Sequence, residues 1–191
     1  MRRGGIAAVA LVGIGAVIAG GIVLRSAGPE ATGALGAQSA AQFEAPRGPA
    51  DSGWLVTRVV DGDTIVVSRA GQRQRVRLIG IDTPESVRPD APVECYGPEA
   101  ADFATAVLQG REVVLESDPT QGDFDAYDRR LAYVWYAQDS GQMILFNAEA
   151  IQAGMAREYT YDDRYAWRDV FVQAEESARS VGRGLWGACT R

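Results

Sequence analysis

The chain has 191 residues, a formal net charge of −6 at pH 7 and two cysteines, which allows one domain of ordinary size. It contains no histidine, and all 19 of its basic residues are arginines. Histidine bases, histidine–metal sites and lysine nucleophiles are therefore excluded, and any catalysis must use carboxylates, arginine, hydroxyls, cysteine or a bound metal ion.

The first 25 residues predict a segment that enters a membrane. Arg2 and Arg3 precede an apolar run over Gly4–Leu24, and Arg25 follows it. About 20 apolar residues can cross a bilayer as a helix. The leading arginines favour a cytoplasmic amino end, so we expect the rest of the chain to be exported. Two alternatives remain open: a retained signal anchor, or a signal peptide that is cleaved farther along the chain.

Residues 26–52 are rich in Ala, Gly, Ser and Pro and carry few large apolar side chains. Such a segment cannot bury enough surface to offset the entropy lost on ordering, so it predicts a flexible linker. The folded domain is expected over residues 53–191, with its first strand near Trp54.

Short runs of β-forming residues follow one another closely after Trp54. Asp61-Gly62 predicts a hairpin turn between the first two runs, and Ala70-Gly71 separates the second from the third. Short strands with tight turns are typical of a small barrel. The expected strands are Trp54–Val60, Thr64–Arg69, Arg73–Ile81, Glu112–Glu116 and Leu131–Tyr136.

Three helices are expected among the strands, which makes the fold class α+β. Pro98 marks the start of the first helix and Gly110 its end. Asn147 is a candidate cap for a short helix that ends at Gly154. The third covers Asp163–Val181, where apolar residues recur at helical spacing. We expect these helices to pack on the barrel.

Acidic side chains lie at the ends of the expected strands. Asp63 belongs to the turn DGDT, and Asp82 and Glu85 belong to DTPE, just after the third strand. Each cluster alone is typical of an ordinary turn, but adjacent strand ends can bring the three carboxylates together. Oxygen ligands without histidine or thiol suit a hard cation, Ca²⁺ or Mg²⁺.

Arginines supply the opposite charge near these turns. Arg73, Arg75 and Arg77 alternate along the third strand and so share a face. Such a row usually marks a solvated face, but an arginine beside a metal-bound phosphate would clamp it. Strict alternation puts Arg77 and Asp82 on opposite faces. A bulge or bend at Gly80 would bring them together.

Five motifs in order resemble the staphylococcal nuclease (thermonuclease) family: DGDT, RLIGIDTPE, ECYGPEA, DAYDRRLAYVW and GLWGAC. The resemblance extends from about Val56 to Trp186. It implies a five-stranded OB-fold barrel with three helices and a Ca²⁺-dependent nuclease, most simply an endonuclease, that hydrolyses phosphodiesters in DNA and RNA. The chain departs from the best-known member, which is basic, because its net charge is negative and it lacks lysine.

The resemblance also implies roles for individual residues. The metal-binding positions are Asp63, Asp82 and, through its main-chain carbonyl, Thr83. The catalytic positions are Glu85, which activates or orients the attacking water, and the phosphate-contacting Arg77 and Arg129. The positions near the nucleotide and its base are Tyr127, Tyr159 and Tyr161. Exported relatives with both cysteine motifs further suggest a disulfide between Cys95 and Cys189.

Two other functions remain open at this point. The same OB-fold can hold nucleic acid without cutting it, as a catalytically silent module tethered to the membrane. The chain can also be a membrane-tethered adaptor with an incidental acidic loop. Modules that have lost activity usually lack acidic or arginine positions of the site, and all five side chains are present here, which favours the enzyme. We expect Ca²⁺ as cofactor, DNA or RNA as substrate, no protein partner, and a monomer on the outer side of the membrane or in the medium.

Overall fold

The computed structural model describes residues 46–86 and 92–189, which belong to the second of two compact units in the chain. The predicted hydrophobic segment and residues 26–45 of the predicted linker lie outside these residues. Within the two described ranges, no helix has the length and apolar character needed to cross a bilayer.

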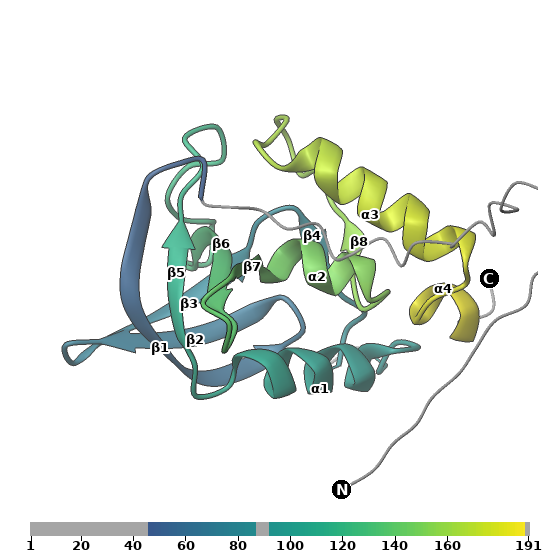
Figure 1. Cartoon of the computed structure of the whole chain (residues 1–191), viewed down its shortest axis with the longest axis horizontal. Helices are drawn as coiled ribbons and strands as arrows, with labels where there is room; N and C mark the ends of the chain where they lie inside the picture. The colour runs from purple at the N-terminus through teal and green to yellow at the C-terminus, as the bar shows by residue number, and fades with distance from the viewer. Residues whose placement is uncertain (1–45, 87–91, 190–191) are drawn as a thin grey trace, which may run out of the picture. The chain divides into compact units, whose positions relative to one another are not determined.

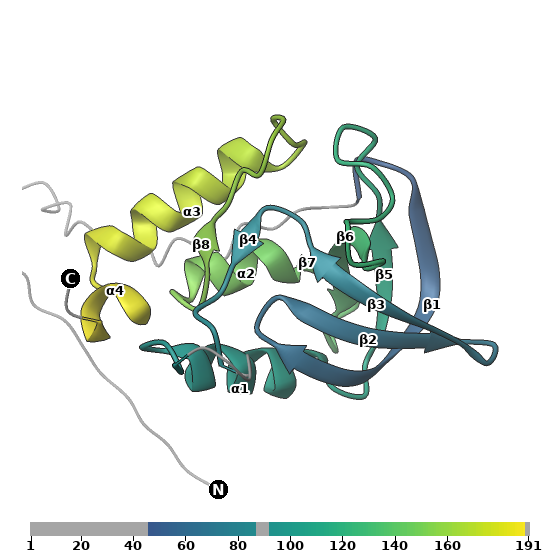
Figure 2. The ribbon, with the colours of Figure 1, turned by 180° about the vertical axis from the view of Figure 1, so that it is seen from behind.

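Five strands close into the predicted barrel, as Figures 1 and 2 show from opposite sides. The hydrogen-bonded order is β3-β2-β1-β5-β6, and β3 also pairs with β6 in parallel, which closes the ring. A short strand, β7, extends the sheet beyond β6. The bounds are β1 Ala50–Asp61, β2 Thr64–Arg69, β3 Gln72–Leu78, β5 Glu112–Glu116, β6 Arg130–Ala137 and β7 Met143–Leu145.

Alternation along the strands fills the barrel with aliphatic side chains. Successive side chains of a strand point to opposite faces, and the inward set is almost fully buried. It includes Val56 of β1, Ile65 and Val67 of β2, and Val76 and Leu78 of β3. Each residue of this type contributes roughly 1.5–3 kcal/mol when fully buried. The barrel wall therefore gives the site a rigid base.

The three predicted helices are present beside the barrel, with α3 packed mainly on α2 and β8, and a fourth, very short helix follows. In α1, Ala100, Ala104 and Leu108 recur every four residues and are buried, so one face of the helix contacts the strands. α2 contacts α3 and β6, between the barrel and the C-terminal helices (Figure 1). The bounds are α1 Gly97–Leu108, α2 Phe146–Gln152, α3 Arg168–Ser180 and α4 Leu185–Ala188.

Two helix predictions were wrong in detail. Asn147 does not cap α2: it lies inside the helix, where its side chain accepts a hydrogen bond from Val134 N–H and donates one to the Ile79 carbonyl, both at 2.9 Å. The third helix starts at Arg168, five residues later than expected. Trp167 fits the helical spacing but precedes the helix, because its indole is buried and bonds Glu116 at 3.2 Å.

Several strand boundaries also differ from the sequence interpretation. β1 begins at Ala50, inside the predicted linker. Just before it, the N–H groups of Arg47 and Gly48 both bond a Glu116 carboxylate oxygen at 2.7 Å. The first hairpin turns at Gly62-Asp63 rather than at Asp61-Gly62, because Asp61 pairs with Thr64.

The third predicted strand divides in two. β3 ends at Leu78, and β4 (Ile81–Asp82) pairs instead with β8 (Arg157–Glu158) in a separate two-stranded sheet. This division decides the geometry of the site.

Candidate metal and phosphate site

The chain bends at Gly80, between β3 and β4. Gly80 has φ +76°, a conformation that favours glycine, and a Cβ at this position would lie 2.7 Å from the Tyr165 ring. The bend interrupts the alternation along the strand. As a result, Arg77 Nη2 reaches Asp82 Oδ1 at 3.3 Å, although strict alternation would have separated the two side chains.

Asp63 is the buried centre of this group and is 6% exposed. Its carboxylate accepts hydrogen bonds from Thr83 N–H at 3.1 Å and from the Thr64 hydroxyl at 3.0 Å. Arg77 Nη1 forms an ion pair with the same carboxylate, although its geometry is not that of a hydrogen bond. Gly62 allows this packing, because a Cβ there would lie 2.7 Å from Thr83 Cγ2. The structure thus brings Asp63, Arg77, Asp82 and Thr83 together.

Negative charge accumulates around Asp63. Burial and the nearby Asp63 carboxylate raise the pKa of Asp61 to about 7. The same two causes raise the pKa of Asp82, while the guanidiniums of Arg77 and Arg157 act in the opposite direction. Carboxylates held this close repel one another, and a bound cation would relieve that repulsion.

Arg157 and Asp61 are neighbours of the site that the sequence interpretation missed. Arg157 pairs with Asp82 across β4 and β8, and it lies 75 residues later in the chain, so no local motif connects them. Asp61 was visible beside Asp63 in DGDT but was interpreted only as part of the turn.

Glu85 is held through its backbone by Glu94. Glu94 N–H donates to the Glu85 carbonyl at 2.8 Å, and Glu85 N–H donates to the Glu94 carboxylate at 3.2 Å. Gly97 packs against the same carbonyl, so closely that a Cβ would lie 2.5 Å from it. These contacts fix where the Glu85 side chain leaves the backbone, close in sequence to Asp82 and Thr83.

The predicted disulfide is present next to these contacts between Glu85 and Glu94. Cys95 follows Glu94 directly and is bonded to Cys189, 94 residues later. The bridge ties the residues that precede α1 to the residue that follows α4. It thereby connects the Glu85 region to the C-terminal helices.

Arg129 lies in the loop directly before β6, the strand that pairs with β3. Its Nε donates to Asp125 Oδ2 at 2.6 Å, while Asp125 Oδ1 accepts from the N–H groups of Tyr127 and Arg129, both at 2.9 Å. Burial opposes the ionisation of Asp125, but these hydrogen bonds hold its pKa below the usual value. A single carboxylate therefore shapes the loop and orients the guanidinium.

The three tyrosines that were predicted from the sequence are exposed at the surface. Tyr127 is 77% exposed, and its ring centroid lies 5.4 Å from the Arg129 guanidinium carbon. Tyr159 and Tyr161 are exposed and lie 6.3 Å apart. Tyr159 is placed near the bend by its N–H, which bonds the Gly80 carbonyl at 3.0 Å. The predicted tyrosines are thus accessible, and two of them form a pair.

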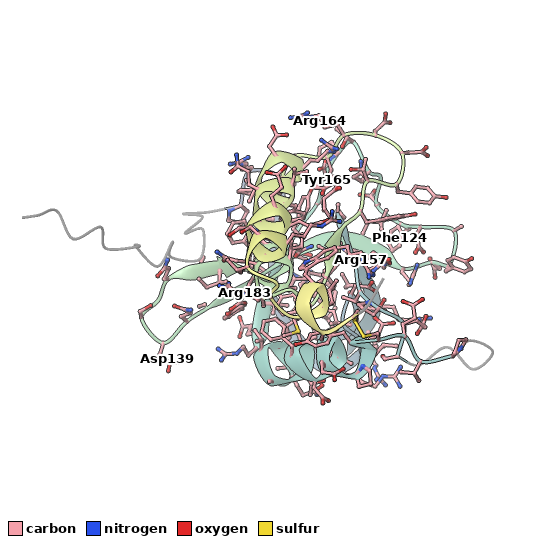
Figure 3. The ribbon with its side chains drawn as sticks, turned by 90° about the vertical axis from the view of Figure 1, so that its right-hand side faces the viewer. Phe124, Asp139, Arg157, Arg164, Tyr165 and Arg183 are labelled. Atoms are coloured by element: carbon pink, nitrogen blue, oxygen red, sulfur yellow. A yellow bond between two sulfur atoms is a disulfide. The ribbon has the colours of Figure 1, made fainter. Side chains whose placement is uncertain are left out.

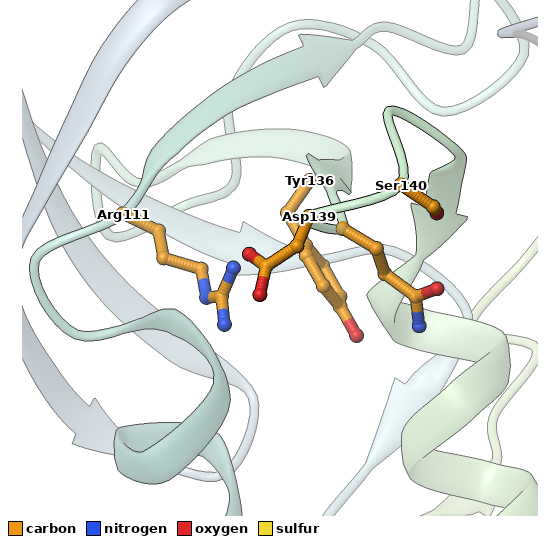
Figure 4. A pocket seen from close by; sticks show the side chains of 5 residues that line it. Arg111, Tyr136, Asp139 and Ser140 are labelled. Atoms are coloured by element: carbon orange, nitrogen blue, oxygen red, sulfur yellow. The ribbon is translucent and has the colours of Figure 1, made fainter.

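A separate hollow lies elsewhere on the domain. It has a volume of about 350 Å³ and is shown in Figure 4. Figure 3 places Asp139, one of its lining residues, on the opposite side of the domain from Phe124, which lies in the Arg129 loop. The hollow contains none of the predicted site residues; its lining is Arg111, Tyr136, Gln138, Asp139 and Ser140.

Comparison with known proteins connects this geometry to a family. The family model "Staphylococcal nuclease homologue" matches residues 75–188, more than half of the chain. The thermonuclease of Staphylococcus hyicus is 38% identical over 154 residues, covering 76% of this chain and 87% of that protein. The chain belongs to the staphylococcal nuclease family.

Two other relatives of this chain also carry the names of nucleases. The thermonuclease of Staphylococcus intermedius is 40% identical over 133 residues, which cover 70% of this chain and 75% of that protein. Endonuclease YncB of Bacillus subtilis is 34% identical over 131 residues, which cover 68% of this chain and 59% of that protein. Both are named as nucleases, which are hydrolases of nucleic acid.

The site of this thermonuclease homologue fits a hard divalent cation. The donors that were predicted from the sequence are all oxygens, from Asp63, Asp82 and the Thr83 carbonyl, as a hard cation requires. Among the described residues, no three acidic or cysteine side chains converge in a metal cluster. A cation with six to eight oxygen ligands would need water or other oxygens to complete its shell on these donors. A site with so few charged ligands predicts weak binding, with a dissociation constant on the order of 10⁻⁴–10⁻³ M.

Proposed function

We propose that this protein is a calcium-dependent nuclease that hydrolyses phosphodiester bonds of DNA or RNA, most simply as an endonuclease, outside the cytoplasm. The observation that supports this most directly is the convergence of Asp63 and Asp82 on the Arg77 guanidinium. Carboxylate oxygens for a cation and a guanidinium for phosphate then lie within one hydrogen-bonded group. Family membership adds the expectation of nuclease chemistry.

Each of the predicted site residues has a separate role in this reaction. Asp63, Asp82 and the Thr83 carbonyl would hold the ion, which would supply positive charge to oppose that of the phosphate. Glu85 orients a water molecule and accepts its proton as the water attacks phosphorus. Arg77 opposes the negative charge that develops on the phosphoryl oxygens.

Further residues near the site would contact the phosphate and the nucleotide. Arg129, oriented by Asp125, opposes the same developing charge from the loop before β6. Tyr127 lies beside it, near the nucleotide, and the exposed pair Tyr159 and Tyr161 offers rings on which bases can stack. The leaving alkoxide departs in line with the attacking water.

Two features support a location outside the cytoplasm. The Cys95–Cys189 disulfide is typical of an oxidising compartment. The apolar run Gly4–Leu24, with arginines before it, supports export and either a retained membrane anchor or a cleaved signal. Cell fractionation would separate these cases: activity that stays in washed membranes supports the anchor, and activity in the medium supports cleavage.

The decisive experiment uses the full chain, purified in mild detergent with its disulfide intact. Cleavage of denatured DNA and of RNA is followed in millimolar Ca²⁺ and in EDTA, for the wild type, Glu85→Gln and Glu112→Gln. Glu112 is an exposed carboxylate on β5 and serves as the matched control. We expect cleavage that requires Ca²⁺, is lost in Glu85→Gln and is unchanged in Glu112→Gln. Nucleic acid that is bound but not cut by the wild type would identify a silent binding module instead.

A further inference from the structure

Three exposed arginines share the outer face of the β1–β2–β3 sheet. Arg58 of β1 is directly opposite Val66 of β2, and Val66 is directly opposite Arg75 of β3. Arg73 lies two residues before Arg75 on the same strand. Directly paired residues in antiparallel strands, and residues two apart on one strand, point to the same side. We call Arg58, Arg73 and Arg75 the arginine track.

The track differs from all other arginines in the described part of the chain. Each of the others has a side-chain hydrogen bond, an ion pair or an aromatic ring beneath its guanidinium: Arg47, Arg69, Arg77, Arg111, Arg129, Arg130, Arg157, Arg164, Arg168, Arg179 and Arg183. No such partner is present for the three track guanidiniums among residues 46–86 and 92–189. In a chain of net charge −6, this face keeps its positive charge uncompensated.

The position of the track is fixed by the sheet. Val66, between Arg58 and Arg75, points to the same outer face yet is only 7% exposed. Long arginine side chains cover apolar surface with their stems while the charged ends stay in water. The three guanidiniums are therefore presented from a rigid sheet, not from a flexible loop.

The track leads directly to the proposed site. Arg77 follows Arg75 by two residues on β3 and points to the same side, where it meets Asp63 and Asp82. Residues two apart on a strand are separated by about 6.8 Å, which is comparable to the spacing of successive phosphates in an extended nucleic-acid strand. A phosphate at Arg77 would place the next phosphates of the same strand along Arg75 and Arg73.

We propose that the arginine track binds the sugar–phosphate backbone of a single nucleic-acid strand as it runs from the scissile phosphate toward the β2–β3 turn. This inference rests on the proposed nuclease function and adds to it a tighter binding of long strands than of short ones. Charge complementarity and continuity with Arg77 favour this occupant. The contacts are to phosphate only, so the track strengthens binding without selecting a base sequence.

The test compares two triple variants of the full chain. One carries Arg58→Gln, Arg73→Gln and Arg75→Gln. The control carries Arg164→Gln, Arg179→Gln and Arg183→Gln, which removes the same charge from the α3 region (Figure 3 labels Arg164 and Arg183). Both are assayed with a labelled dinucleotide substrate and with a single strand several times longer, in Ca²⁺. Affinity for the long strand is measured in EDTA over a range of salt concentrations.

We expect the track variant to keep the wild-type kcat and to cut the dinucleotide normally, which also reports correct folding. Its KM and Kd for the long strand should rise roughly tenfold, and the slope of log K against log salt should fall by about 2, since each phosphate contact on a single strand contributes about 0.7. The control variant should resemble the wild type.

Three results would contradict the proposal that the arginine track binds the nucleic-acid backbone. The first is an unchanged salt slope in the track variant while the wild type cuts normally. The second is an equal loss of affinity in both variants, which would reflect net charge alone. The third is normal nucleic-acid binding with lost binding to vesicles that contain phosphatidylglycerol, which would assign the face to an anionic membrane. A wild type that neither cuts nor binds nucleic acid would instead refute the proposed function, and the track with it.

Discussion

The two arginines predicted to contact phosphate are held in different ways. Arg77 projects from the barrel wall on β3, and its partners are Asp63 and Asp82, the same carboxylates that are proposed to bind the metal ion. Arg129 projects from a loop, and its partner Asp125 is not part of the metal set. Both side chains are mostly covered, with 16% and 23% of their surface exposed.

We call Arg77 a shared guanidinium, because its carboxylate partners are also the proposed ligands of the cation. We call Arg129 a dedicated guanidinium, because its partner Asp125 has no such second role. The position of Arg77 depends on how Asp63 and Asp82 divide their charge between the arginine and a cation. Arg129 is oriented by Asp125 whether or not a cation is bound. Substitutions at Arg77 and its carboxylate partners should therefore affect both catalysis and Ca²⁺ binding, whereas a substitution at Asp125 should affect catalysis alone.

The largest expected effect comes from Arg77→Ala. We expect kcat to fall about 10²–10³-fold, the usual cost of removing one group that stabilises a developing negative charge. Affinity for Ca²⁺ should not fall, because the variant frees two carboxylates from a competing cation. Initial rates and calorimetric Ca²⁺ titration would measure the two quantities separately.

Asp82→Asn is the matched comparison, because it removes a proposed ligand and should weaken both Ca²⁺ binding and catalysis. Loss of Ca²⁺ binding in Arg77→Ala as well would show that the arginine holds the site together, and the distinction between shared and dedicated guanidiniums would fail.

A smaller effect is expected from Asp125→Asn on the loop side. Asparagine can still accept the Tyr127 and Arg129 N–H bonds that shape the loop, but it loses the ion pair to the Arg129 side chain. We expect kcat to fall about tenfold, as is common for groups that orient a functional side chain, with Ca²⁺ affinity unchanged.

Two further variants sharpen this test. Asp125→Glu restores the charge and should recover part of the rate, which a merely structural role would not explain. Asp123→Asn, in the same loop, should have no effect. If kcat is the same in Asp125→Asn and in the wild type, Arg129 does not depend on its carboxylate partner.

The last effect is expected at the base of the Arg129 loop, on the free energy of unfolding rather than on kcat. Asp118 is 3% exposed and accepts hydrogen bonds from the Tyr133 hydroxyl at 2.6 Å, Ala166 N–H at 2.8 Å and Thr120. Burial opposes its ionisation, but these hydrogen bonds hold its pKa below the usual value. A depressed folded-state pKa stabilises the protein above the unfolded pKa, and this contribution is lost as the pH falls through the folded value.

Asp118→Asn should therefore lower the free energy of unfolding by about 1–2 kcal/mol at neutral pH and by less in acid below about pH 4. Urea denaturation at both pH values, with Asp139→Asn as an exposed control, would measure this. An equal difference between Asp118→Asn and wild type at both pH values would mean that the charge of Asp118 does not contribute.

The barrel could be predicted from the sequence because its signals are local. Alternating apolar residues and the Ala70-Gly71 turn define β2 and β3 without knowledge of the rest of the chain. The bend at Gly80 was also open to prediction, since only such a bend could join Arg77 to Asp82. The disulfide followed from the family resemblance rather than from the spacing of the cysteines.

Interactions between distant segments could not be predicted in this way. Asn147 has the composition of a helix cap, but its tertiary partners Val134 and Ile79 place it inside α2. Arg157 becomes a neighbour of Asp82 only through the pairing of β4 with β8. The proposed roles of the individual site residues remain predictions, which the variants above address.

The Cys95–Cys189 disulfide closes a covalent ring that contains α1, three strands of the main sheet and the Arg129 loop. A protein that is exported as proposed meets proteases, and the arginines in exposed loops of this ring are natural points of cleavage. One cut within the ring cannot separate the two fragments, because the bridge still joins them. A nicked molecule would migrate as one piece on a non-reducing gel and as two after reduction, and its strands would stay paired next to the site.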